Sequence, residues 1–151
     1  AFGMQVIYAA LPGHSHSGSM DRMALDEFLS CADVISIHCP LTAKTQNLIG
    51  DAQFSLMKDS TLVINSARGG IINEPALKQA LIMGQIAGAA TDVLTVEPPV
   101  DGNVLLDPAI PNLIITPHSA WVATEARQRL VIQLADNLRG FLDGKPLNRV
   151  V

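Results

Sequence analysis

The chain has 151 residues, of which 48% are hydrophobic and only 16% are charged, so it is long and apolar enough to form a globular domain with a hydrophobic core. Its 10 basic and 14 acidic residues give a net charge of −4, and no basic cluster occurs, which argues against nucleic acid as a partner. No apolar run approaches the roughly 20 residues that span a bilayer, and the first residues lack an export pattern, so we expect a cytoplasmic protein without membrane contact.

Strand-like and helical segments alternate along the chain. Short apolar runs predict buried strands at residues 4–8, 33–37, 61–65, 86–92 and 113–116. Apolar residues that recur every three or four positions predict helices at residues 23–31, 74–83 and 123–142. Short helical turns are expected within residues 43–58, with Asp51 as an N-cap, and proline and glycine predict loops at residues 9–20 and 96–111. This alternation is typical of a doubly wound parallel α/β sheet.

Few residues could bind a metal or form a disulfide. Cys31 and Cys39 are too few for a disulfide framework, and we expect both to be reduced. The pair His14 and His16, and His38 beside Cys39, could suggest a metal. Neither pair has a third ligand at a recognisable spacing, so we expect no metal site.

The segment TLVINSARGG, residues 61–70, sets the pattern of a candidate site. Its apolar strand ends in a small polar turn that presents the cation Arg68 before two glycines. Two later strands run into Asp92 and then Glu97, and into His118. Because ligands bind outside the carboxyl ends of the strands in an open parallel sheet, we expect these four side chains to line one ligand-binding crevice there.

This set of groups suits the reduction of a carbonyl compound. Arg68 could hold a carboxylate through two parallel hydrogen bonds, and His118 could transfer a proton, since histidine titrates near neutral pH. Glu97 could favour the protonated imidazole, and Asp92 could contact a cofactor amide. A surface ion pair, a turn residue and a solvated loop charge are equally available interpretations of Arg68, His118 and Glu97, and the residues alone do not decide.

Four segments resemble the signatures of the NAD(P)-dependent D-2-hydroxyacid dehydrogenases. They are HCPLTAKTQNLIG at residues 38–50, LVINSARGGIINEPAL at 62–77, GAATDVLTVEPP at 88–99 and ITPHSAW at 115–121. Order and spacing match along essentially the whole chain, and the branch that it most resembles is the bacterial glycerate (hydroxypyruvate) dehydrogenases.

The resemblance implies a Rossmann-like fold that is truncated. Residues 1–120 would form most of the dinucleotide-binding domain, and residues 121–151 a long helix and tail that return toward a substrate domain. The family's first strand, its glycine-rich phosphate loop and its substrate domain do not occur in these 151 residues. The chain therefore resembles the C-terminal half of such an enzyme, in which the first strand would lie mid-sheet beside residues 4–9.

The resemblance also implies roles for individual residues. Arg68 would bind the carboxylate and carbonyl of a 2-oxo acid, and His118, paired with Glu97, would be the acid in reduction and the base in oxidation. The residues implied at the cofactor, in addition to Arg68 and His118, are Cys39, Pro40 and Thr45 on the adenosine and pyrophosphate side, and Ala67, Asp92, Ser119 and Ala120 at the nicotinamide.

The implied activity is hydride transfer between NAD(P)H and a small 2-oxo acid, hydroxypyruvate or glyoxylate, in a homodimer. After residues 4–8 the chain reads Ala9-Ala10-Leu11-Pro12, with no acid for the ribose hydroxyls of NAD and no nearby arginine for a 2′-phosphate. NAD is the expected cofactor, and NADP is not excluded. Two alternatives stay open: a nucleotide-sensing, corepressor-like binding module of the same fold, and an inactive fragment.

Overall fold

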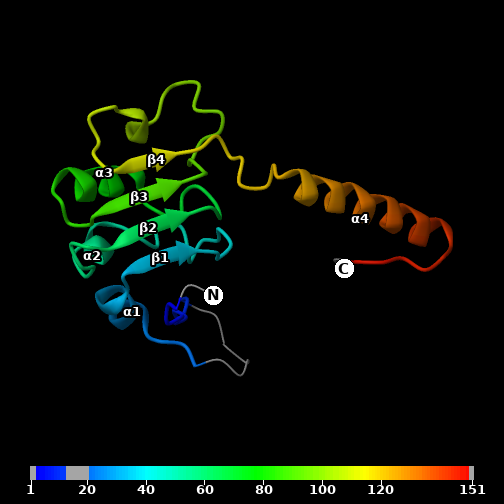
Figure 1. Cartoon of the computed structure of the whole chain (residues 1–151), viewed down its shortest axis with the longest axis horizontal. Helices are drawn as coiled ribbons and strands as arrows, with labels where there is room; N and C mark the ends of the chain where they lie inside the picture. The colour runs from blue at the N-terminus through cyan, green and yellow to red at the C-terminus, as the bar shows by residue number, and fades with distance from the viewer. Residues whose placement is uncertain (1–2, 13–20, 150–151) are drawn as a thin grey trace. The chain divides into compact units, whose positions relative to one another are not determined.

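The computed structural model describes residues 3–12 and 21–149, and in this part of the chain four parallel strands form one sheet (Figure 1). The strands are β1 (Val34–Ile37), β2 (Leu62–Asn65), β3 (Gly88–Thr91) and β4 (Leu113–Ile115). They lie side by side in chain order, and the register places Val63 between Ile35 and Ala89. A strand order that runs in one direction is that of one half of a doubly wound fold. The predicted parallel α/β sheet is confirmed.

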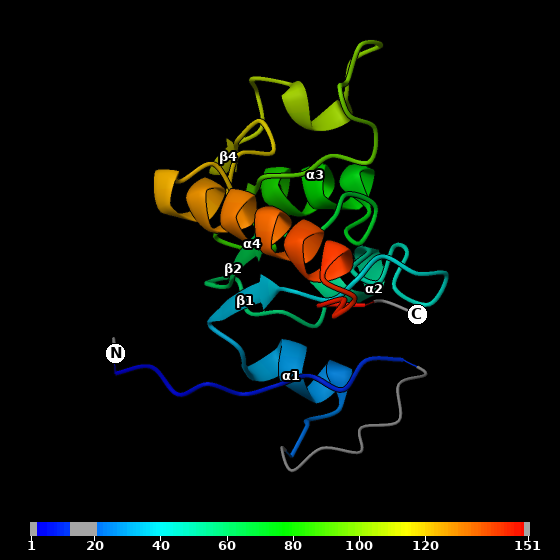
Figure 2. The same cartoon turned by 90° about the vertical axis from the view of Figure 1, so that its right-hand side faces the viewer.

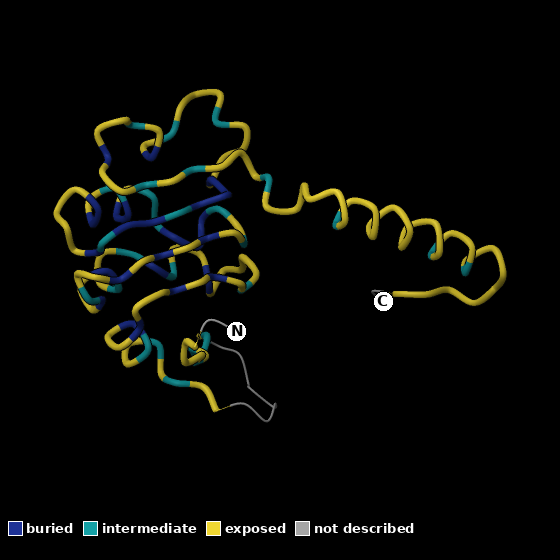
Figure 3. The backbone as a smooth tube through the Cα atoms, viewed as in Figure 1, coloured by how far each residue is buried: buried dark blue, intermediate teal, exposed yellow. Residues whose placement is uncertain are grey.

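The core lies on one face of this sheet. Buried and exposed positions alternate along β1 and β2 (Figure 3). The buried apolar residues of these strands are Ile35, Ile37 and Val63. They join a cluster with Phe54 and Leu77 from the helices. Strands of a sheet that buries one face show this alternation with a period of two residues.

One α-helix precedes β1, and two further α-helices and one 3-10 turn connect the described strands in chain order. They are α1 (Leu25–Cys31), α2 (Asp51–Phe54), α3 (Glu74–Ile82) and η1 (Val104–Leu106). The Asn73 side chain caps α3 by accepting a hydrogen bond from the Ala76 amide at 3.0 Å. The predicted N-cap of α2 is wrong by one residue: Gly50 is the N-cap, and its amide donates to the Gln53 side chain at 3.1 Å, while Asp51 begins the helix.

The prediction of a buried strand at residues 4–8 is wrong for this structure. Met4 and Val6 are 66% and 70% exposed, and the segment joins no ladder. Its end is held by one isolated bridge, in which the Met23 amide donates to the Tyr8 carbonyl at 2.9 Å and the Ala10 amide to the Met23 carbonyl at 2.8 Å. An apolar run becomes a stable strand only where neighbouring strands and a hydrophobic face cover it.

Residues 118–151 form a second compact unit, which is described by itself. Its helix α4 (Thr124–Leu142) has 19 residues and is continuous (Figure 2), as predicted. The tail folds back on the helix, since the Asn148 side chain donates to that of Asn137 at 2.8 Å. No residue of α4 is buried, and the exposed apolar side chains are Leu130, Val131, Ile132, Leu134, Leu138, Phe141 and Leu142. No helix in the described ranges has the length and hydropathy needed to cross a membrane.

We expect the amide hydrogens of residues 4–7 to exchange with solvent within seconds, because none of them donates a hydrogen bond to the described residues. Amides of Val63 and Ile64, in a strand with neighbours on both sides, should exchange orders of magnitude more slowly. Hydrogen exchange with mass spectrometry compares the two segments in one sample. Slow exchange at residues 4–7 in a monomeric sample would contradict the open arrangement of this segment.

Candidate functional site

The turn that follows β2 is held by a buried side chain, Asn65. Its Oδ1 accepts a hydrogen bond from the Ala67 amide at 3.1 Å, and its Nδ2 donates to the Arg68 carbonyl at 3.0 Å. Asn65 is only 3% exposed, so these two hydrogen bonds are shielded from water. Asn65 is not among the predicted site residues, although a polar residue at the end of a buried strand is a signal for such a role.

Arg68 extends from this turn toward solvent. Its guanidinium donates to the carbonyl of Ala67 at 2.7 Å, and within the described ranges it makes no ion pair. The remaining N–H groups of the planar fork are therefore available to a carboxylate.

Gly69 brings the loop after β2 against the loop after β3. A Cβ atom at this position would lie 1.9 Å from the carbonyl oxygen of Leu94 and 2.6 Å from the amide nitrogen of Thr95. No side chain fits there. The close backbone contact thus places the turn of Arg68 beside the start of the loop that bears Glu97.

The substitution Gly69→Ala should lower the free energy of unfolding by at least about 3 kcal/mol, because the added methyl group overlaps backbone atoms that cannot move independently. The matched control is Gly50→Ala, whose Cβ would meet nothing closer than 3.7 Å. That change should cost only about 1 kcal/mol, since alanine is a poorer N-cap than glycine but its methyl group overlaps no other atom. Urea titration of both variants measures the difference, and equal losses would contradict the close approach.

Asp92 lies at the carboxyl end of β3 and is buried, with 7% of its surface exposed. Thr116, the residue after β4, donates its hydroxyl proton to Oδ1 of Asp92. The Thr91 hydroxyl turns away and donates to the Val93 carbonyl at 2.7 Å. The carboxylate is therefore fixed between the ends of two neighbouring strands.

Glu97 is exposed, in the loop between β3 and η1. Its Oε1 accepts a hydrogen bond from the Leu94 amide at 2.7 Å, and the peptide bond to Pro98 is cis. The Asp92 side chain and the loops that bear Arg68 and Glu97 thus lie at the same carboxyl edge of the sheet.

His118, Ser119 and Ala120 begin the second unit. His118 has a left-handed backbone, with φ of 51°, which costs a residue other than glycine roughly 1–3 kcal/mol. The indole of Trp121 donates to the His118 carbonyl at 3.0 Å and helps to hold this conformation. Backbone strain of this kind concentrates at functional sites, which supports a functional role for His118.

Cys39, Pro40 and Thr45 belong to the loop that follows β1. Thr45 is fully buried, and its hydroxyl donates to the Pro40 carbonyl at 2.6 Å and accepts from the Thr42 amide at 2.7 Å. Thr45 can therefore act on a ligand only through the loop that it holds. Cys39 is half-buried and Pro40 is exposed.

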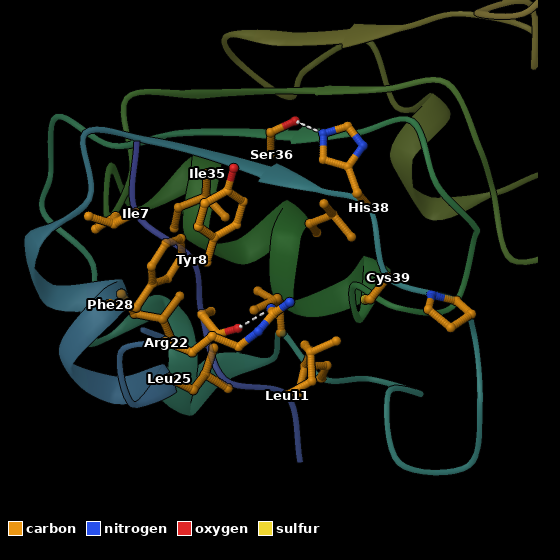
Figure 4. A pocket seen from close by; sticks show the side chains of 16 residues that line it. Ile7, Tyr8, Leu11, Arg22, Leu25, Phe28, Ile35, Ser36, His38 and Cys39 are labelled. Carbon is orange, nitrogen blue, oxygen red and sulfur yellow. Dashed lines mark hydrogen bonds between the residues drawn. The ribbon is translucent and has the colours of Figure 1, made fainter. Parts of the chain in front are cut away.

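A cavity of about 500 Å³ lies along β1, and none of the predicted catalytic residues lines it (Figure 4). Its walls come from residues 7–11, α1 and residues 35–40, and its lining includes Ile7, Leu11, Leu25, Phe28, Ile35 and Cys39. Arg22 lies over the Tyr8 ring, 5.9 Å from its centroid, and donates to the Ala9 carbonyl at 3.1 Å. The expectation that no arginine stands near the end of residues 4–8 is therefore wrong.

Burial raises the pKa of the Cys39 thiol, whereas Cys31 is exposed. Because the thiolate is the reactive form, iodoacetamide at pH 8 should modify Cys31 well before Cys39. Peptide mass spectrometry follows both sites, and urea-unfolded protein, in which the two rates should converge, is the control. Faster modification of Cys39 in the folded protein would contradict this environment.

No group of three or more His, Cys, Asp or Glu residues that could hold a metal occurs within residues 3–12 and 21–149. His14 and His16 lie outside the described residues.

Comparison with known proteins shows which proteins this chain resembles in sequence and in fold. A model of the family described as "D-isomer specific 2-hydroxyacid dehydrogenase, NAD binding domain" matches residues 1–120. The glycerate dehydrogenase of Methylorubrum extorquens is 49% identical over 150 residues, which are 99% of this chain and 46% of that protein. The hydroxypyruvate reductase of Blautia hydrogenotrophica is 40% identical over 152 residues, 99% of this chain and 47% of that protein.

Among solved structures, the NAD-complexed D-isomer specific 2-hydroxyacid dehydrogenase of Lactobacillus delbrueckii ssp. bulgaricus superposes with a TM-score of 0.72 and is 35% identical. The similarity covers 87% of this chain and 43% of that one. The chain thus spans about half the length of the relatives that it matches.

Proposed function

The chain belongs to the D-isomer specific 2-hydroxyacid dehydrogenases, as their NAD-binding domain, and on this premise we propose that the full-length protein reduces hydroxypyruvate or glyoxylate to D-glycerate or glycolate. The similarity to a glycerate dehydrogenase and a hydroxypyruvate reductase supports this choice of substrates. NAD, the expected cofactor, is confirmed by the family. The observation that carries the proposal is the placement of Arg68, Asp92 and Glu97 at one edge of the sheet.

Arg68 holds the substrate in this proposal. Its exposed fork binds the carboxylate of the 2-oxo acid through parallel hydrogen bonds and polarises the carbonyl that is to be reduced. The two hydrogen bonds of the Asn65 side chain fix the backbone from which the Arg68 side chain extends. This arrangement limits the reorganisation needed when the substrate binds.

His118 gives a proton to the carbonyl oxygen in reduction and removes it in oxidation. Glu97 pairs with the imidazole and orients it for this transfer. Chain connectivity supports this grouping, because only Pro117 lies between Thr116 and His118, so that their Cα atoms are at most about 7 Å apart. Thr116 itself binds Asp92.

The residues present fit a dinucleotide. Asp92 is a buried carboxylate that can accept a hydrogen bond from a carboxamide, and the apolar wall beside Cys39 and Pro40 suits an adenine ring. Ala67, Ser119 and Ala120 would border the nicotinamide, and Thr45 would act by holding Pro40. When bound, the cofactor supplies the hydride. NADPH remains an alternative donor, since Arg22 stands beside Ala9.

The full-length protein in this proposal contributes a first strand and a substrate domain. We propose that a first strand lies along β1, in the space of the cavity, between that strand and residues 7–9. Residues 121–151 return toward a substrate domain, and the exposed apolar side chains of α4 support a further contact there. The complete enzyme is a cytoplasmic homodimer in this proposal, and the 151-residue chain alone is inactive.

The substitution His118→Asn in the full-length protein should lower kcat for hydroxypyruvate at least about 100-fold, because it removes the group that transfers the proton. Asparagine tolerates the left-handed backbone, so the fold should survive. The assay follows oxidation of NADH and, in parallel, of NADPH, and NADH binding by the variant is the control. A folded parent that binds NADH but turns over no 2-oxo acid would favour a nucleotide-sensing module instead.

A further inference from the structure

Glu97 stands in a loop that needs support from outside itself. Residues 95–103 contain no helix or strand, and most of them are exposed. Glu97 uses Oε1 to accept the Leu94 amide at the root of this loop. A carboxylate that must pair with a catalytic imidazole requires that the backbone beneath it stays in place.

Glu74, in the first turn of α3, binds both ends of this loop. Its Oε1 accepts a hydrogen bond from the Thr95 amide at 2.7 Å, and its Oε2 accepts one from Nδ2 of Asn103 at 2.9 Å. Glu74 is half-buried, and the Asn73 cap fixes the helix end from which it projects. One carboxylate thus closes the loop between residues 95 and 103.

Asn103 shows why a carboxylate is needed at position 74. Its Oδ1 accepts the Leu105 amide at 2.9 Å and caps η1, which leaves its Nδ2 as a donor. Thr95 offers a second donor through its amide. Only a side chain with two acceptor oxygens satisfies both donors, and a glutamine would turn an N–H group toward one of them.

We propose that Glu74 is a positioning residue that holds the Glu97 loop by binding its two ends. Through the contact of Gly69 with Leu94 and Thr95, the same loop is packed against the turn of Arg68. Glu74 therefore keeps Glu97, the proposed partner of the imidazole, at a fixed position relative to Arg68, which binds the substrate. The catalytic part of this inference rests on the proposed function, whereas the loop contact does not.

The first experiment measures loop order in the 151-residue chain. Glu74→Gln should raise the hydrogen-exchange rate of the Leu94 and Thr95 amides about tenfold or more, because it breaks a charge-assisted pair that holds the loop to which both belong. Glu27→Gln is the matched control: Glu27 is also a first-turn glutamate, in α1, and within the described ranges its carboxylate makes no hydrogen bond or ion pair. Its exchange at residues 94–97 should equal that of the unmodified chain.

A swapped pair separates polarity from size. In Glu74→Gln combined with Asn103→Asp, the glutamine amide can donate to the new carboxylate, which still caps η1, while its oxygen accepts from Thr95. Exchange at the Leu94 and Thr95 amides should return toward the original rate. Unchanged exchange in Glu74→Gln, or no recovery in the swapped pair, would overturn the proposal that Glu74 holds the two ends of the loop.

The second experiment measures kcat and KM for hydroxypyruvate in the full-length protein. Glu74→Gln should lower kcat about tenfold with little change in KM, and it should shift the pH profile in the same direction as Glu97→Gln. In the Glu97→Gln background, Glu74→Gln should have little further effect on kcat. An equal loss of kcat in both backgrounds would overturn the positioning role, even if exchange changes as expected. Absence of turnover by the unmodified protein would refute the proposed function. The contact of Glu74 with the loop would then be judged by the exchange data alone.

Discussion

The contact between Gly69 and the Leu94 carbonyl is the constraint on which the candidate site depends. It joins the loops that follow two neighbouring parallel strands, β2 and β3, at a distance that leaves no room for a side chain. The positions of Arg68 and of the loop that bears Glu97 are consequently set by backbone packing. Two flexible, charged side chains are thereby anchored to one rigid edge, which lowers the entropy that a ligand must remove when it binds.

Regular elements and strand ends could be predicted because they follow from local sequence. The apolar runs of β1 to β4 and the periodicity of α3 and α4 contain their own signal, and a parallel sheet brings its carboxyl ends to one edge whatever the loops contain. Residues 4–8 carry an equally apolar run, yet they form no strand. Their conformation depends on a neighbour that the local pattern does not specify.

Contacts between distant parts of the chain could not be predicted in this way. Arg22 reaches Ala9 from 13 residues away, and Glu74 reaches Thr95 from 21. No periodicity or motif records such a pairing, because it arises only when the elements pack together. The same applies, at short range, to the N-cap of α2, where the Gln53 side chain decides the geometry that Asp51 was expected to provide.

The position of β1 also has a consequence for the behaviour of the chain in solution. Among the described strands β1 is an outer one, it borders a cavity of about 500 Å³, and Val34 at its start is 43% exposed. An unpaired strand edge is a template on which another chain can add a strand, and α4 adds further apolar surface. We therefore expect the isolated chain to aggregate through this edge as its concentration rises, despite its net charge of −4.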